Sequence, residues 1–257
     1  MRSDLDRWFD ALQQRHLAEL EWAEVTRALR ALSSAYVQRR AKLATGAALD
    51  GRGKRAAFAL FYGPLHFAAV ASTLAGLAAQ GEAICPVSRI EDLGCGTGAA
   101  GAAWALGCDG KPRVSGLDVH PWAVGEAAWT YRYFGLDGTA ARADVSTARV
   151  DPRAARVAAY TLNELPDAAR QRVLDQALAS GAPLLIVEPI ARGISPWWDR
   201  AAAAVIAKGG RSDDWKLPLD MPERWRLLDR AAGFRRDHLT ARTLWLGAEG
   251  RSRAEGG

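Results

Sequence analysis

Apolar residues at helical spacing dominate the first third of the chain, and nothing there alternates like a strand. Between residues 4 and 44, the i, i+3, i+4, i+7 pattern of an amphipathic helix is formed by Leu5, Trp8, Phe9 and Leu12. Residues 56–80 carry no formal charge but are rich in alanine and interrupted at Gly63-Pro64, which predicts a buried helix pair instead of a membrane span. We therefore expect an N-terminal helical extension over residues 1–82.

The pattern changes after Pro86, where short apolar runs alternate with alanine-rich helical segments. The predicted strands are residues 87–93, 113–119, 139–145, 156–162, 182–189 and 242–248. Strands that alternate with helices predict an α/β fold with a doubly wound, mostly parallel sheet and room for an antiparallel strand near the end. We expect this Rossmann-like domain to span residues 83–249, followed by a disordered polar tail at 250–257.

A glycine-rich turn joins the first predicted strand to the helix after it. It reads Asp92-Leu93-Gly94-Cys95-Gly96-Thr97-Gly98, and glycines at a spacing of two allow a tight turn and a close approach of a ligand to the backbone. The helix that follows presents free N–H groups to a polar or negatively charged group. The turn therefore predicts a ligand site.

Two further acids end the next two predicted strands. Asp118 lies about 20 residues beyond Gly98, where a carboxylate can accept hydrogen bonds from both hydroxyls of a ribose. Asp144 ends the third strand, where a carboxylate can accept a hydrogen bond from an adenine amino group. Because the carboxyl ends of parallel strands meet at one edge of a sheet, Asp92, Asp118 and Asp144 together predict a nucleoside site.

Two nucleoside cofactors fit this pattern. Gly94-x-Gly96-x-x-Ala99 satisfies the dinucleotide fingerprint, so a nicotinamide-dependent oxidoreductase is the alternative. Asp92, two residues before the first glycine, suits a cationic amino-acid ligand better than a pyrophosphate. None of the five tyrosines is followed four residues later by lysine, so the proton relay of short-chain reductases is missing. Both observations favour S-adenosylmethionine.

The strings DLGCGTG and GLDV resemble the first two motifs of the class I S-adenosylmethionine-dependent methyltransferases, over residues 90–190. The resemblance implies that adenosylmethionine is the cofactor and that the cofactor-binding residues are Asp92, Gly94, Cys95, Gly96, Gly98, Asp118, Val119, Asp144, Val145 and Thr161. It also implies a lid formed by Arg55, Tyr62 and His66.

A narrower resemblance covers residues 32–40, 53–70, 158–178 and 184–193. These segments resemble the methyltransferase-like family associated with the small subunit of the mitochondrial ribosome, which has bacterial relatives. The resemblance implies rRNA or the small ribosomal subunit as a partner, and a role in its methylation or assembly. Several members carry a cysteine cluster for an iron–sulfur centre, whereas this chain has no cysteine after Cys108. That departure keeps a small-molecule methyltransferase open as an alternative.

Candidate catalytic residues follow the fourth predicted strand. Methyl transfer needs an acceptor lone pair in line with the S–CH₃ bond, and in some cases a base. Asn163 could orient an acceptor and Glu164 could accept its proton, although both could simply form the turn before the next helix. Glu188-Pro189 ends the fifth strand and could line the acceptor pocket. Trp197 and Trp198, near Arg192 and Arg200, could stack on a substrate base.

Composition and charge limit which cellular compartment and which partners we expect for the protein. The 34 Lys and Arg against 29 Asp and Glu give a formal charge of +5, which is compatible with RNA but does not require it. The three cysteines, with no CxxC pair, indicate a reducing compartment, and the four histidines show no metal-ligand spacing. The N-terminus lacks the apolar stretch of a secretory signal. We therefore expect a cytoplasmic protein without a metal or a membrane partner.

The sequence leaves three functions open. The first is a methyltransferase acting on rRNA or another RNA-associated acceptor. The second is a cofactor-binding protein of small-subunit assembly with little catalysis. The third is a small-molecule methyltransferase, which a deep apolar pocket would favour.

Overall fold

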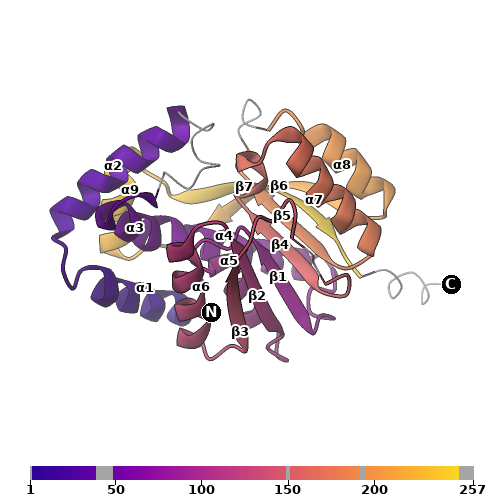
Figure 1. The fold of residues 1–257 in the computed structure, drawn as a ribbon, viewed down its shortest axis with the longest axis horizontal. Helices are drawn as coiled ribbons and strands as arrows, with labels where there is room; N and C mark the ends of the chain where they lie inside the picture. The colour runs from indigo at the N-terminus through magenta and orange to yellow at the C-terminus, as the bar shows by residue number, and fades with distance from the viewer. Residues whose placement is uncertain (1, 39–48, 149–150, 191–194, 249–257) are drawn as a thin grey trace.

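The computed structural model describes residues 2–38, 49–148, 151–190 and 195–248 (Figure 1). The strands are β1 (Arg89–Leu93), β2 (Arg113–Asp118), β3 (Gly138–Arg142), β4 (Ala155–Ala159), β5 (Leu184–Glu188), β6 (Arg211–Pro218) and β7 (His238–Leu246). The helices are α1 (Arg2–His16), α2 (Trp22–Gln38), α3 (Arg52–Ala57), the π-helical turn η3 (Phe58–Tyr62), α4 (Gly63–Ala79), α5 (Ala99–Leu106), α6 (Pro121–Tyr133), the 3₁₀ turn η4 (Leu162–Glu164), α7 (Asp167–Ser180), α8 (Trp198–Ala207) and α9 (Glu223–Ala231). The predicted tail at 250–257 lies outside the described residues.

Within the described residues, seven strands form one sheet in the order β3-β2-β1-β4-β5-β7-β6. Strands β1 to β5 are parallel, whereas β7 runs antiparallel to β5 and to β6. The order reverses between β1 and β4, and such a switch point is where open α/β sheets bind ligands. The predicted doubly wound, mostly parallel α/β sheet with an N-terminal helical extension is confirmed.

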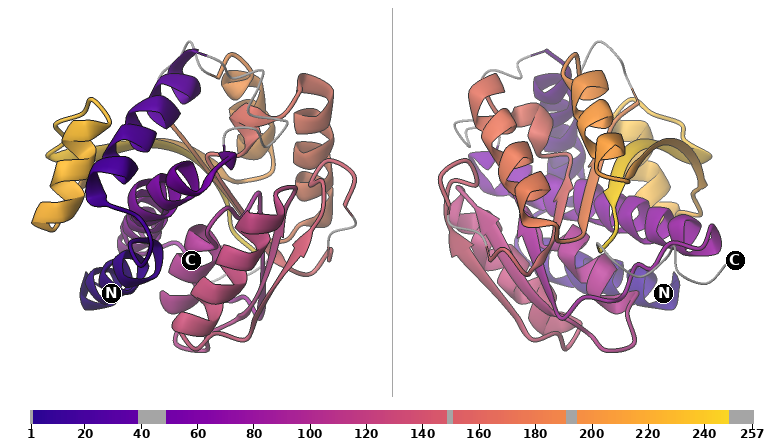
Figure 2. Two further views of the ribbon diagram at one scale, coloured as in Figure 1. Left: turned by 60° about the vertical axis from the view of Figure 1, so that its left-hand side comes forward. Right: turned by 90° about the vertical axis from the view of Figure 1, so that its right-hand side faces the viewer.

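Each face of the sheet is covered by its own hydrophobic core. Side chains alternate along β5, so that Leu185 and Val187 point to one core while Leu184 and Ile186 point to the other. The first core contains the apolar residues of α4 and α5, and the second those of α7 and α8 (Figures 1 and 2). This burial on both faces explains the continuous apolar run in the sequence of β5.

The N-terminal helices share the first core with the sheet. Trp8 of α1 packs against Phe67 of α4 and against Phe134 after α6, with ring centroids 5.6 Å apart in both pairs. The same core includes Ile90 of β1. Helix α9 lies beside α2 (Figure 1), and its Trp225 and Leu228 belong to the same core. The division of the chain at residue 82 stays a prediction.

The apolar segment before the sheet forms one continuous helix, Arg52–Ala79, and the predicted break at Gly63-Pro64 is wrong. The π-helical turn η3 explains the difference. Gly63 donates its N–H to the carbonyl of Phe58, five residues back, so the helix widens just where Pro64 would otherwise clash with the preceding turn. By length and composition this helix could cross a membrane, but 78% of its most apolar stretch is buried inside the fold, as in a core helix.

Strand β6 was not predicted, because its sequence lacks an apolar run. Its eight residues include two adjacent aspartates and a lysine, and most of them are at least partly exposed. The strand lies at the edge of the sheet and pairs only with β7, so one side of it faces solvent. In β6 only Leu217 is buried, so the strand has no run of alternating apolar and polar residues that could be recognised in the sequence.

Two of the cysteines are paired, and this pairing was not predicted from the sequence. Cys85 and Cys108 form a disulfide with their Cα atoms 5.3 Å apart, and Cys95 is free and buried. Cys85 precedes β1 and Cys108 follows α5. Helix α5 runs back in the direction opposite to β1. The residue before β1 and the residue after α5 therefore both lie at the amino edge of the sheet. The cytoplasmic location stays a prediction.

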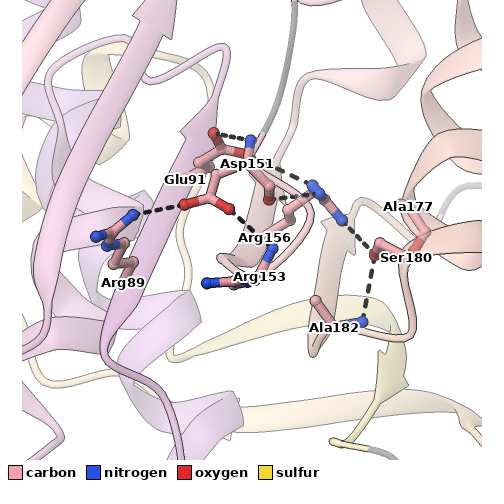
Figure 3. Close-up of polar contacts among 8 residues, drawn as sticks. All are labelled: Arg89, Glu91, Asp151, Arg153, Arg156, Ala177, Ser180 and Ala182. Atoms are coloured by element: carbon pink, nitrogen blue, oxygen red, sulfur yellow. Dashed lines mark hydrogen bonds and ion pairs between the residues drawn. The ribbon is translucent and has the colours of Figure 1, made fainter.

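A buried ion pair closes the amino edge of the sheet (Figure 3). Arg156 of β4 lies 3.5 Å from the carboxylate of Glu91 of β1, and it donates hydrogen bonds to Ser180 Oγ and to the Asp151 carbonyl. Asp151 in turn donates its N–H to Glu91. This network ties β1, β4 and the end of α7 together at the edge opposite the carboxyl ends of the strands.

Candidate active site

A cavity of about 1350 Å³ lies at the carboxyl ends of β1 to β5. Because β7 is antiparallel, its amino end, at His238, reaches the same edge and lines the same cavity. Helical residues from η3 and α4, including Phe58 and His66, form a further wall. The volume exceeds the roughly 300–1,000 Å³ that usually holds one small ligand, so two molecules fit side by side.

The glycine loop contributes Gly94 and Gly96 to the cavity lining. Gly94 has a φ of +67°, and a Cβ there would collide with the side chain of Thr161, so glycine lets the loops after β1 and β4 meet. Gly98 and Cys95 do not line the cavity. Gly98 packs against Ala127 and Tyr131 of α6, and Cys95 is buried beneath the loop.

Asp92 is also beneath the loop and does not reach the cavity. Its Oδ2 accepts hydrogen bonds from the Gly101 N–H at 2.8 Å and from the Tyr131 hydroxyl at 3.4 Å. Burial raises the pKa of Asp92 to about 7. Alternation along β1 points this side chain to the face covered by α5, where a Cβ on Gly101 would lie only 2.9 Å from it. The structure therefore gives Asp92 a contact with the start of α5, and not the direct contact with a ligand that the sequence predicted.

Asp118 and Val119 line the cavity at the end of β2. The Asp118 carboxylate accepts hydrogen bonds from the N–H groups of Gly96 and His120, at 3.0 and 2.8 Å, so it is held against the glycine loop. Burial raises the pKa of Asp118. The side chain of Val119 is 45% exposed although it is apolar, and it offers a flat apolar surface inside the cavity.

Asp144 and Val145 line the cavity beyond the end of β3. Asp144 Oδ1 accepts hydrogen bonds from both the N–H and the Oγ of Ser146, at 2.8 and 2.7 Å. These bonds lower the pKa of Asp144, so it is ionised at neutral pH. Since both bonds use Oδ1, Oδ2 is left to accept a hydrogen bond from a ligand.

The end of β4 carries backbone strain at Tyr160. Its φ of +59° is rare for a bulky residue, and such strain is concentrated at functional sites. The Tyr160 ring stacks on His66 of α4, with centroids 4.4 Å apart. Burial lowers the pKa of His66 to about 3, so its ring is neutral. Of the predicted lid, Tyr62 and His66 line the cavity, whereas Arg55 donates to the Leu49 carbonyl and does not.

Both predicted catalytic residues, Asn163 and Glu164, line the cavity, but Asn163 is fully engaged with protein. It donates its N–H and Nδ2 to the two carboxylate oxygens of Glu188, at 3.2 and 2.6 Å. Its Oδ1 accepts hydrogen bonds from Ser195 Oγ and Trp197 Nε1, both at 2.9 Å. Asn163 therefore holds Glu188 in place, and both polar atoms of its side chain already bond to protein.

Glu188 was not recognised in the sequence as a candidate base, only as a residue that could line the acceptor pocket. It is fully buried at the end of β5 and lines the cavity. Burial, together with the nearby charge of Glu164, raises the pKa of Glu188 to about 8 despite the two hydrogen bonds from Asn163. The only signal in the sequence was an acid at the end of an entirely apolar strand.

Trp197 and Trp198 lie away from the cavity, so they are not placed to stack on a ligand in it. Both are buried in the second core, and neither lines the cavity. Arg192 lies outside the described residues, and Arg200 is exposed on α8. Tryptophan indoles at this position serve packing and, for Trp197, the hydrogen bond to Asn163.

One part of the cavity lining was not recognised in the sequence. Phe58 lines the cavity beside the predicted Tyr62 and His66, and Phe234 and Arg236 line it from the segment before β7. These two groups are about 170 residues apart in the chain, so only the return of β7 to this edge brings them together. Among the described residues, no group of three or more His, Cys, Asp or Glu side chains could hold a metal ion.

No model of a known protein family matches the sequence, and no curated protein matches it. Among solved structures, the mitomycin 7-O-methyltransferase MmcR is similar with a TM-score of 0.53 and 15% identity, over 93% of this chain and 72% of that chain. This likeness and the strand order decide the fold. The chain has the class I methyltransferase fold.

A second similar solved structure is magnesium protoporphyrin IX methyltransferase (ChlM) from Synechocystis PCC 6803 with bound SAM. It has a TM-score of 0.46 and 16% identity, over 89% of this chain and 97% of that chain. The narrower resemblance to the family associated with the mitochondrial ribosome stays a prediction.

Proposed function

We propose that the chain is an S-adenosylmethionine-dependent methyltransferase that holds its acceptor in the same cavity as the cofactor. The observation that carries this proposal is the cavity at the switch point of the sheet. Its lining combines the glycine loop, Asp118 and Asp144 with the buried carboxyl of Glu188. The first group suits a nucleoside, and the second suits the removal of a proton.

The residues of the cavity fit the cofactor. Asp118 is already aimed at the glycine loop, where a ribose would lie beside it. Val119 is exposed where an adenine ring needs an apolar surface, and the free oxygen of Asp144 suits the adenine amino group. When bound, adenosylmethionine supplies an electrophilic methyl group on a positively charged sulfur.

The chain's own residues would then handle the acceptor. Glu188 accepts the proton that an acceptor hydroxyl loses, because a carboxyl with a pKa of about 8 is a stronger base than an ordinary glutamate. Asn163 orients Glu188 through its two hydrogen bonds. The burial of Glu188 keeps its own carboxyl away from bulk water.

The size and the aromatic lining of the cavity support a small-molecule acceptor. rRNA or the small ribosomal subunit, and a role in assembly with little catalysis, are the alternatives that rest on the narrower resemblance. Incubation with labelled adenosylmethionine and small-subunit rRNA tests them, because label in the RNA would identify it as the acceptor.

Titration calorimetry with adenosylmethionine, S-adenosylhomocysteine and NADH tests the cofactor. We expect the first two to bind and Asp118→Ala to weaken both at least tenfold, about 1.4 kcal/mol. Asp109→Ala is the matched control, because Asp109 is exposed and lies outside the cavity. A preference for NADH, or equal binding by Asp118→Ala and the parent chain, would contradict the proposal.

A further inference from the structure

One part of the cavity lining is aromatic and suits a flat molecule. The stacked pair of Tyr160 and His66 forms one surface, and Phe58 meets the edge of His66 with ring centroids 6.2 Å apart. Aromatic side chains recognise planar ligands through their faces and edges. The neutral ring of His66 makes no hydrogen bond within the described residues, so both of its nitrogens are left for a ligand.

Arg236 supplies a cation to the cavity lining. Asp229 Oδ1 accepts one hydrogen bond from Arg236 Nη1 at 3.0 Å, and Asp229 Oδ2 accepts one from the Arg236 backbone N–H at 2.8 Å. The guanidinium lies 3.7 Å from the centroid of the Phe234 ring. A single N–H of the guanidinium is used by Asp229, so the group is fixed in position while donors remain for an oxygen of a ligand.

Tyr160, Glu188 and Arg236 all line the cavity. Burial raises the pKa of the Tyr160 hydroxyl, the charge of Glu188 raises it further, and the charge of Arg236 lowers it. A flat ligand along the Tyr160–His66 surface would therefore have both a carboxyl group and a guanidinium within the same cavity. The first suits a group that loses a proton, and the second suits a group that carries negative charge.

We propose, building on the methyltransferase function above, that the acceptor is a planar phenol that also carries a carboxylate. Its ring lies along Tyr160 and His66, its phenolic hydroxyl faces Glu188, and its carboxylate binds Arg236.

The group transfer balances with adenosylmethionine as the only co-reactant. The phenol gives its proton to the ionised Glu188 carboxylate, and the phenolate oxygen forms a bond to the methyl carbon. The electron pair of the broken S–CH₃ bond stays on sulfur, which leaves S-adenosylhomocysteine and a methyl ether. Amines with a free lone pair and carboxylates need no such base, so Glu188 distinguishes a phenol from them.

Calorimetry in the presence of saturating S-adenosylhomocysteine tests the acceptor. The probes are 4-hydroxybenzoate and the longer 4-hydroxycinnamate, each with its neutral amide and with its 4-methoxy counterpart. We expect at least one acid to bind roughly tenfold more tightly than both its amide and its methoxy counterpart. Incubation with adenosylmethionine should then convert that acid into its methyl ether.

A double variant, Arg236→Gln with Asp229→Asn, tests the guanidinium. It removes both charges together, so it leaves no buried charge unpaired. We expect it to bind S-adenosylhomocysteine like the parent chain but to lose the preference for acid over amide. Arg230→Gln, an exposed position on α9, is the matched control and should retain that preference.

The outcomes separate the acceptor from the cofactor. If S-adenosylhomocysteine binds but acids bind no better than amides, or no probe binds, the acceptor proposal is wrong and the methyltransferase proposal stands. Transfer of label to rRNA without binding of any phenol has the same meaning. If S-adenosylhomocysteine itself does not bind, both proposals fail.

Discussion

Glu188 shows how burial decides the chemistry of a single residue. The neighbours of this acid in the sequence are ordinary, but the folded chain removes it from water and surrounds it with Asn163 and the charge of Glu164. Desolvation disfavours the charged carboxylate more than the two hydrogen bonds favour it. The result is a carboxyl that titrates close to neutral pH inside a cavity, which is typical of a general base.

The pH dependence of methyl transfer tests this assignment. A base must be deprotonated to act, so kcat/KM should rise with pH through a pKa of about 8. Glu188→Gln should lower kcat/KM by about 100-fold and remove this rise. The measurement is the initial rate of methyl transfer between pH 6 and 9. If the loss appears in Glu164→Gln instead, the base is Glu164, as the sequence analysis expected.

At the scale of elements, the two edges of the sheet have separate tasks. The carboxyl edge of β1 to β5 holds the cavity, while the amino edge is closed by the ion pair of Arg156 and Glu91 (Figure 3). The antiparallel β7 links the two, since it enters at the cavity with His238 and ends at the opposite edge. Changes at the amino edge should therefore alter stability without altering the site.

Arg156→Met tests this separation. The substitution leaves Glu91 buried without its partner, and the free energy of unfolding should fall by about 3 kcal/mol. Adding Glu91→Leu removes the unpaired buried charge and should recover a large part of the lost free energy of unfolding. Urea unfolding measures the stability, and calorimetry with S-adenosylhomocysteine should give the same affinity in all three proteins. A weakened affinity would show that the two edges are coupled.

At the scale of the whole molecule, the fold buries several acids whose pKa values lie above their ordinary range. The pKa of Asp92 is about 7 and that of Glu188 about 8, in both cases because of burial. The folded protein therefore binds more protons than the unfolded chain at neutral pH. Stability then decreases as pH rises through the folded pKa values.

The decrease should be clearest between pH 6.5 and 8. Below pH 6.5 the neutral His66, with its pKa lowered to about 3, acts in the opposite direction, because the unfolded chain binds its proton more readily. Between pH 6.5 and 8 we expect the free energy of unfolding to fall by about 2 kcal/mol. Urea unfolding without ligand measures this, and Glu188→Gln should flatten most of the slope. A stability that is constant over this range would show that these acids are not buried as described.

The parallel strands, most of the helices and the position of Asp118 and Asp144 in the cavity could be predicted from the sequence. Hydrophobic periodicity is a local property, and the glycine loop is contiguous in the chain. The sequence also predicts that Asp118 and Asp144 lie at one edge of the sheet, because the carboxyl ends of parallel strands meet there. For these features, neighbours in the sequence and the topology of a parallel sheet were sufficient.

Only the tertiary structure decided the rest. The disulfide of Cys85 and Cys108, the edge strand β6 and the pairing of Asn163 with Glu188 depend on segments that are distant in the chain. The position of Asp92 under the loop and the raised pKa of Glu188 depend on burial. The aromatic and cationic lining of the cavity needs both the π-helical turn and the antiparallel return of β7. Residue types along a chain specify which groups are available, but long-range pairing and desolvation determine what they can do.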